Sequence, residues 1–277
     1  MIVWSVGNVI VKGAPMLGLR LAFWRVGAAL VLYLILLSFA RRRLTVQHLV
    51  KSAPAGVALG LYTALFFSAI KLTTIANAAV IGSMQPLILL WISSRYFGEK
   101  IGKWLIGMTL VAVAGAAAVV FGSSGQPQWS LEGDALAVVA MLVFAAYFAL
   151  AKRGRRSVPA FEFQTSVWIT GWLALLPVAL FDRSTLVVPD AVQWRWVFLM
   201  VLVPGTGHLL MNWAHSHIRL STSSILTLAT PAISVVVAAL WLGETIGGLQ
   251  IIGISIVMVS LGLIIERQSS KGSVAEA

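Results

Sequence analysis

The chain has 277 residues, of which 59% are hydrophobic and 10% are charged, and its mean hydropathy is +0.94. Soluble domains carry roughly 25% charged residues, so this composition indicates a protein that lies in the lipid bilayer. The absence of cysteine excludes a disulfide framework, a thiolate metal site and thiol catalysis. The net charge of +11 comes from short basic clusters between apolar runs. That pattern is typical of cytoplasmic loops rather than of nucleic-acid binding, so we expect no nucleic-acid partner.

Uncharged or nearly uncharged runs predict ten membrane spans. Several runs exceed the roughly 17 residues needed to cross the hydrocarbon layer, and the others reach that length with flanking residues. The runs lie at about 1–11, 26–40, 52–70, 72–94, 104–124, 135–151, 163–181, 196–218, 220–243 and 245–265. The first run is short because Lys12 and Pro15 close it, and comparison with the second half predicts that this span begins before Met1. No pattern of a cleavable signal peptide is present.

An internal repeat relates the two halves of the chain. Residues 72–102 read LTTIANAAVIGSMQPLILLWISSRYFGEKIG, and residues 217–247 read HIRLSTSSILTLATPAISVVVAALWLGETIG. Their alignment pairs Pro86 with Pro231 and Glu99 with Glu244. A proline inside a span frees a carbonyl group that other helices or a water-lined cavity must satisfy. Matching interrupted spans in two halves point to the binding site of a transporter, so both prolines are candidate hinges.

The loops predict the orientation of the chain. Basic residues follow every even-numbered span, for example Arg41, Arg42 and Arg43 after span two and Lys152 after span six. The positive-inside rule therefore places both termini in the cytoplasm. Because each repeat contains five spans, the second repeat is predicted to be inverted relative to the first. The predicted domains are residues 1–125 and 132–266, followed by a cytoplasmic polar tail at 267–277. Duplication that serves packing alone remains an alternative, because small residues also let helices approach closely.

Polar side chains at helical spacing give the candidate binding residues. His208, Asn212, His215 and Arg219 share one face of span eight. A polar stripe within a span is costly unless it faces protein or water, so it lines a cavity or forms a hydrogen-bonded packing stripe. The full set of candidate solute-binding residues is Asn8, Lys12, Tyr62, Asn77, Gln85, Tyr147, His208, Asn212 and His215. Aromatic, amide and cationic groups together suit a small amphipathic solute that carries a carboxylate, although packing is again the alternative.

The acidic residues suggest how transport would be driven. All nine lie in loops, tails or span ends, and none is a mid-membrane carboxylate of the kind that proton-coupled carriers commonly use. Proton coupling would therefore fall to His208 or His215, and uncoupled export stays open. Glu99 and Glu244 each follow a glycine just before the next span. We expect each to cap that following helix, with a gating role as the alternative.

The proline in span four, the Gly-Glu pair and the small-residue-rich next span, all repeated in the second half, resemble the EamA family of the drug/metabolite transporter superfamily. The opening from Trp4 through Asn8 to Lys12, followed by Arg25 in span two, is similar to the start of such proteins, and 133–153 is similar to the start of their second half. The resemblance implies ten helices in two inverted five-helix repeats around a central cavity in the bacterial inner membrane. It also implies carriers that export amino acids, other metabolites or drugs, and aromatic amino acid exporters would fit the predicted lining.

These observations predict an all-α, multi-pass membrane protein that exports a small metabolite by alternating access. We expect no cofactor and no bound metal, and a monomer or weak homodimer in the bilayer. A channel-like facilitator is the first alternative, although channels usually form symmetric oligomers whereas here the symmetry lies within one chain. A membrane-embedded enzyme is less supported, because His208 and His215 have no third metal ligand at useful spacing and no Ser/His/Asp set has a recognisable context.

Overall fold

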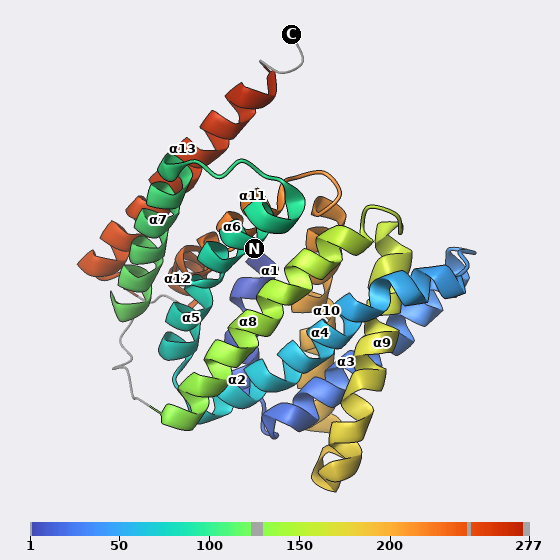
Figure 1. The fold of residues 1–277 in the computed structure, drawn as a ribbon. Coiled ribbons are helices and arrows are strands. Elements are labelled where there is room, and N and C mark those ends of the chain that lie inside the picture. The colour runs from blue at the N-terminus through green and yellow to red at the C-terminus, as the bar shows by residue number, and fades with distance from the viewer. Residues whose placement is uncertain (1, 123–129, 243–244, 274–277) are drawn as a thin grey trace.

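A computed structural model describes residues 2–122, 130–242 and 245–273, and this part of the chain is helical without strands (Figure 1). The first repeat contains α1 (Ile2–Ser5), α2 (Gly7–Gly13), α3 (Gly18–Phe39), α4 (Val46–Leu72), α5 (Ile75–Ser83), α6 (Gln85–Phe97) and α7 (Lys103–Gly122). The second contains α8 (Leu131–Gly154), α9 (Ala160–Phe181), the 3-10 turn η1 (Arg183–Leu186), α10 (Ala191–Ala214), α11 (Leu220–Leu226), α12 (Ala229–Leu242) and α13 (Gly248–Ser273).

The described residues contain nine helical spans long and apolar enough to cross a membrane, counting α5–α6 and α11–α12 as one each. The helices α1 and α2 occupy the position of the predicted first span. Large apolar side chains point outward from these helices, such as Ile35 on α3, Val111 on α7 and Val259 on α13. An exterior of this kind matches the hydrocarbon of lipid and would be unusual for a monomeric soluble protein.

Two helix boundaries differ from the predicted ones. The second span begins at Gly18 rather than near residue 26, so Arg25 lies inside α3. The uncharged run misplaced this boundary because the arginine interrupts the run but not the helix. At the other end of the chain, α13 continues through Ser273 into the segment that was predicted to be a polar tail. Straight-chain polar residues such as Glu266 and Gln268 are good helix formers, so the helix extends beyond its apolar part.

The predicted interruptions are present in spans four and nine. Span four ends its first half at Ser83 and resumes at Gln85, and Pro86 lies in the first turn of α6. Span nine is interrupted between α11 and α12, and Pro231 lies in the first turn of α12. Proline suits the first turn because its missing N–H would have no partner there. The breaks lie beside the two prolines, although Pro54, Pro177 and Pro204 lie inside unbroken helices, and hinge motion about the breaks stays a prediction.

Two equivalent lysines show how the repeats are inverted. Lys12 ends α2 and Lys152 lies in the last turn of α8, and each donates hydrogen bonds to carbonyls at the end of the third span of its own repeat. The acceptors are Ile70 and Thr73 for Lys12, and His215 and Ile218 for Lys152. These acceptors are aligned by the same register that pairs Pro86 with Pro231. The ends of α2 and α8 lie at opposite ends of the bundle (Figure 1).

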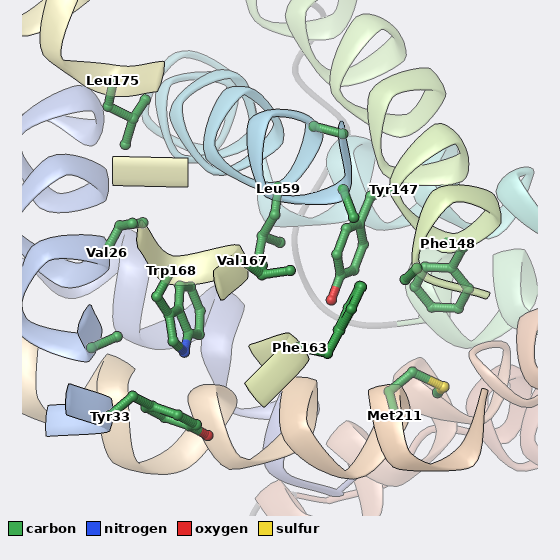
Figure 2. Close-up of a cluster of buried hydrophobic side chains, with 14 of the residues drawn as sticks. Val26, Tyr33, Leu59, Tyr147, Phe148, Phe163, Val167, Trp168, Leu175 and Met211 are labelled. Atoms are coloured by element: carbon green, nitrogen blue, oxygen red, sulfur yellow. The ribbon is translucent and has the colours of Figure 1, made fainter. Parts of the chain in front are cut away.

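The core lies where α3, α4, α8, α9 and α10 meet, and Figure 2 shows its buried side chains. Tyr147, Phe148 and Trp168 are among its largest fully buried members. Glycines let α4 and α9 approach closely, since a Cβ atom added at Gly60 would lie 2.5 Å from the carbonyl oxygen of Gly171. Small residues at helix crossings are typical of membrane bundles, where backbone approach replaces a hydrophobic driving force.

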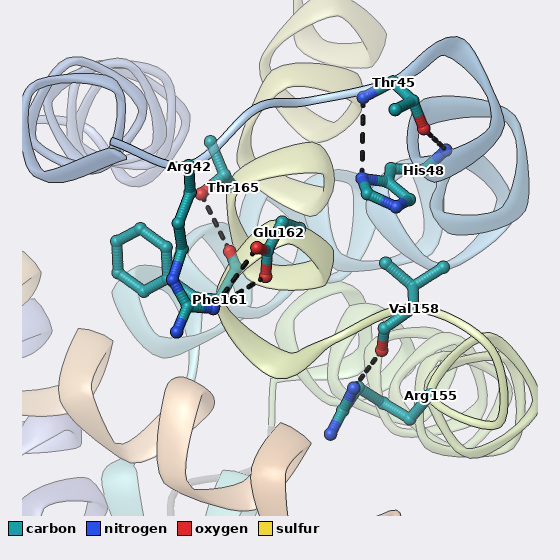
Figure 3. A network of polar contacts seen from close by, with 8 residues as sticks. All are labelled: Arg42, Thr45, His48, Arg155, Val158, Phe161, Glu162 and Thr165. Atoms are coloured by element: carbon teal, nitrogen blue, oxygen red, sulfur yellow. Dashed lines mark hydrogen bonds and ion pairs between the residues drawn. The ribbon is translucent and has the colours of Figure 1, made fainter. Parts of the chain in front are cut away.

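One end of the bundle carries most of the basic loops, and we call it the basic face. It includes the links that contain Arg41–Arg43, Lys100, Lys152–Arg156 and Arg219. Figure 3 shows part of this face, where Arg42 pairs with Glu162 at 3.2 Å and Thr45 and His48 cap the start of α4. Arg155 donates hydrogen bonds to the carbonyls of Asn212 and Val158. Of these contacts, the pair of Arg42 with Glu162 joins the two repeats at this face.

Candidate solute-binding cavity

A cavity of ≈ 160 Å³ lies where three interrupted helices meet. Its wall includes residues at each interruption: Trp4 and Gly7 at the α1–α2 break, Ser83 and Gln85 at the α5–α6 break, and Thr227 and Pro231 at the α11–α12 break. The helices α3, α4, α8 and α10 complete the wall, so both repeats contribute. A cavity of about 150 Å³ accommodates benzene, so this one has room for a small organic group.

Aromatic side chains form one side of the cavity. Tyr62 stacks on Phe144 with ring centroids 4.1 Å apart and on Phe66 at 5.3 Å. Elsewhere on the wall, the ring centroids of Trp4 and His208 lie 5.1 Å apart, and the indole N–H of Trp4 donates a hydrogen bond to the carbonyl of Pro204. Tyr62 comes from α4 of the first repeat and Phe144 from α8 of the second. This stack therefore fixes the contact between the two repeats and presents aromatic surface to a bound molecule.

Three buried polar side chains on the wall have an atom without a hydrogen-bond partner. They are Arg25 from α3, Gln85 from α6 and His208 from α10, and their exposed fractions are only 2%, 3% and 5%. The atoms concerned are Arg25 Nε, Gln85 Nε2 and His208 Nδ1. Such groups are rare in folded proteins, because an unpaired buried polar atom costs about 1–3 kcal/mol. Their gathering around one cavity is therefore its most informative feature.

The structure separates the candidate binding residues into two groups. Asn8, Tyr62, Gln85 and His208 line the cavity. The other five, Lys12, Asn77, Tyr147, Asn212 and His215, lie elsewhere. Lys12 caps the end of α4, and Asn77 donates to the carboxylate of Asp134 at 3.2 and 3.3 Å. Solute binding by any of the nine stays a prediction.

The polar stripe on α10 turns away from the cavity after His208. Asn212 is fully buried and shares hydrogen bonds with the hydroxyl of Tyr147 at 2.9 Å and the amide oxygen of Gln164 at 2.5 Å. His215, just beyond the last residue of α10, is fully buried beside Phe148 at 5.0 Å. Most of the stripe thus packs inside the protein, which was the alternative interpretation of its spacing. Arg219 is exposed in the link before α11, so the stripe ends at His215.

His215 stays uncharged near neutral pH. Its pKa is lowered from 6.5 to about 3, first by burial and then by the positive charges of Lys152 and Arg155. Protonation would place a third positive charge in a buried site, and no hydrogen-bond acceptor is available to either ring nitrogen in the described part of the chain. This environment does not favour the predicted role of His215 as a carrier of protons during transport.

Carboxylates from each repeat hold the short half-helices of the other. Glu99 accepts hydrogen bonds from the backbone N–H groups of Leu220 and Ser221, at 2.7 and 3.1 Å, and from the Ser221 hydroxyl at 2.5 Å. It therefore caps α11 rather than the following helix α7, which corrects the expected partner. A negative charge at a helix N-terminus is stabilised by free N–H groups and by the helix dipole. The sequence could not supply this partner, because the two segments are distant along the chain.

Asp134 makes the corresponding contact at the opposite face. It lies in the first turn of α8 and accepts hydrogen bonds from the Thr73 hydroxyl at 2.5 Å and from the side-chain amide of Asn77, at the start of α5.

The glycine of the first Gly-Glu pair ends a helix. Gly98 has a φ of +67° and ends α6 in the left-handed region that favours glycine. Glu244 lies outside the described residues, so its expected capping role stays a prediction.

Comparison with known proteins identifies the family. Residues 1–121 and 131–266 match the EamA-like transporter family. The chain belongs to this family. The result confirms the resemblance seen in the sequence, including the drug/metabolite transporter superfamily, and the apolar helices agree with a multi-pass membrane protein.

Relatives of this member of the EamA-like family include the uncharacterized transporter sll1319 of Synechocystis, 24% identical over 76% of the chain. The chain covers 64% of the length of that protein. Another relative is the pseudopaline exporter CntI of Pseudomonas aeruginosa, 25% identical over 86% of the chain and 82% of its own length. A solved crystal structure shares the fold with a TM-score of 0.75 at 18% identity, and the likeness covers 94% of this chain and 92% of the other.

No set of three or more His, Cys, Asp or Glu residues within the described ranges is arranged to hold a metal ion. The cavity offers aromatic surface, amide groups and one guanidinium instead. Arg25 was not among the candidate binding residues, although a lone arginine inside an apolar helix is a signal for function. The uncharged run that predicted this span starts after Arg25, and the family resemblance placed Arg25 in span two without giving it a role.

Proposed function

We propose that the chain is a secondary transporter that exports a small amphipathic metabolite by alternating access. The observation that carries this proposal is the position of the cavity, which both repeats enclose at their helix interruptions. Transporters built from inverted repeats bind their substrates at such interruptions near the middle of the bilayer. Relative movement of the two repeats would then expose the same site to each side in turn.

The contacts at the basic face support a conformation closed on that side. Glu99 holds α11, Lys152 holds the link that precedes it, and the Asn212 network fills the space between α8, α9 and α10. In contrast, several cavity residues lie in the parts of their helices nearer the opposite face, such as Phe67 on α4 and Ala78 on α5. Opening toward the basic face would require the contacts of Glu99 with α11 to break.

The distribution of basic residues supports a cytoplasmic basic face, with both termini inside and the protein in a bacterial inner membrane. Export would then carry the solute from the basic face to the opposite face. A monomer suffices for this mechanism, because the symmetry needed for alternating access lies within one chain. A weak homodimer would not alter it.

The test has two parts. Cells that overproduce the protein are compared with cells carrying an empty vector, and we expect one small metabolite or a related group to accumulate outside the overproducing cells. The accumulated compound is then measured in proteoliposomes, where a carrier gives flux that saturates with solute concentration. Single-channel currents, or flux that rises without saturation, would contradict a carrier.

Variants in the wall connect this flux to the cavity. A combined His208→Ala and Asn212→Ala variant is expected to lose at least about ten-fold in flux, because it removes one wall residue and the network behind the wall. His217→Ala is a matched control, since His217 is exposed and stacks on Trp213 outside the cavity. Normal flux in the double variant would exclude this cavity as the transport site.

A further inference from the structure

The guanidinium of Arg25 is a buried positive charge without a protein counter-ion in the part of the chain that the structure describes. Arg42, in contrast, pairs with Glu162 at the basic face. The Arg25 guanidinium carbon instead lies 5.2 Å from the ring of Trp168 and 5.7 Å from that of Phe67. Aromatic faces stabilise a cation only in part, and a buried charge normally requires an opposite charge with hydrogen bonds.

The neighbouring unpaired atoms have matching chemistry. Gln85 offers an amide N–H group, and His208 offers a ring nitrogen that can carry a proton. Trp168 lies against both Arg25 and His208, with its ring 5.9 Å from the imidazole, so both side chains pack on the same indole. Two hydrogen-bond donors and a cation thus line the same cavity. An arrangement of donors and positive charge is what a carboxylate requires.

We propose that Arg25 binds the carboxylate of the transported solute, with Gln85 and His208 as additional donors. This inference rests on the proposed transport function and narrows its substrate class to small organic carboxylates. The apolar body of the solute would lie on the stack formed by Tyr62, Phe66 and Phe144, which faces the same cavity. Cationic compounds without an acidic group are excluded, because Arg25 repels them in a site of low dielectric constant.

The experiment uses the purified full chain in lipid nanodiscs and two probes of nearly equal shape. 3-Phenylpropanoate carries a carboxylate, and 3-phenylpropanamide replaces it with a neutral amide. Binding is followed by tryptophan fluorescence, since Trp4 lies on the cavity wall and Trp168 beside Arg25. We expect the wild type to bind the carboxylate at least ten-fold more tightly than the amide. Equal affinity for both probes, or no binding of the carboxylate, would overturn the proposal.

Variants separate ligand binding from a structural role. Arg25→Met is expected to lose the preference for the carboxylate while its melting temperature without ligand stays equal or rises, because an unpaired buried charge is removed. Arg25→Lys keeps the charge and is expected to retain part of the preference. Arg43→Gln, which removes an exposed arginine at the basic face, is the control and should bind like the wild type. A lower melting temperature in Arg25→Met with an unchanged preference would instead assign Arg25 to structure and refute the proposal.

Transport and binding measurements on the same protein test the carboxylate assignment and the transport function separately. If proteoliposomes transport only neutral or cationic solutes, the carboxylate assignment fails and the transporter stands. If the wild type binds the carboxylate but moves no solute of the panel, the proposed transport function fails and the binding site stands. If the accepted solutes all carry a carboxylate and Arg25→Met loses their transport, both are supported.

Discussion

The crossing of α4 and α9 gives a sharp test of the packing that holds the cavity wall. A Cβ atom at Gly60 would lie 2.5 Å from the Gly171 carbonyl oxygen and 3.0 Å from its Cα atom, both backbone atoms. An ordinary carbon–oxygen contact is about 3.3 Å, so Gly60→Ala would force the helices apart by about 0.8 Å. Overpacking of this kind costs about 1–3 kcal/mol. Because Tyr62 follows on the same helix, we also expect weaker solute binding.

Gly107→Ala is the matched control, because a Cβ atom at Gly107 would meet nothing within 4 Å. Both variants gain the same helix propensity from alanine, up to about 1 kcal/mol, so this gain cancels in their comparison. We expect Gly60→Ala to unfold more easily than Gly107→Ala by about 1–3 kcal/mol, measured by SDS titration of protein in mixed micelles. Equal stability of the two variants would refute the close approach of α4 and α9.

Three further predictions follow from individual contacts. Glu99→Ala removes three hydrogen bonds to α11 and should cost about 1–3 kcal/mol of stability. The control is Glu132→Ala, at an exposed position in the first turn of α8, which should cost less than about 1 kcal/mol. Equal losses of stability in the two variants would contradict the capping role of Glu99. Asn212→Ala leaves its buried partners Tyr147 and Gln164 unpaired and should destabilise the protein by about 2–4 kcal/mol. Tyr147→Phe should lose less stability than Asn212→Ala. His215→Gln should make the stability of the protein less sensitive to acid. Below pH 6.5 the unfolded state binds a proton at His215, whereas the folded state does so only near pH 3, so the wild type loses about 2 kcal/mol of stability between pH 7.5 and pH 5. Thermal unfolding at these two pH values measures the loss, and an equal loss in the variant would contradict the reasoning.

Much of the architecture was predictable because hydrophobic runs, proline positions and basic loops are local properties of the sequence. The interruptions beside Pro86 and Pro231 were predictable because the missing N–H of proline weakens a helix locally and both prolines recur in the repeat. The match of Lys12 with Lys152 is likewise visible in the repeat. The start of α3 was misplaced because a search for uncharged runs treats Arg25 as a boundary, whereas the helix places it in the interior.

The site was harder to predict, because helical spacing gives the face of a residue but not what that face contacts. His208 and Asn212 are one turn apart on α10, yet the first lines the cavity and the second bonds to Tyr147 inside the core. Which of them meets the cavity depends on how α8 and α9 pack against α10. Partners distant along the chain, such as Glu99 with Leu220, have no local signal at all.

The exchange of carboxylates between the halves bears on how such a chain can be assembled. Glu99 caps the short helix α11 of the second half, and Asp134 binds polar side chains beside the short helix α5 of the first, so each half supplies contacts that the other lacks. Two separately synthesised halves would therefore be expected to fold fully only when they associate, inserted in the membrane in opposite orientations. Joining them in one polypeptide guarantees that each half meets a complementary neighbour in equal number.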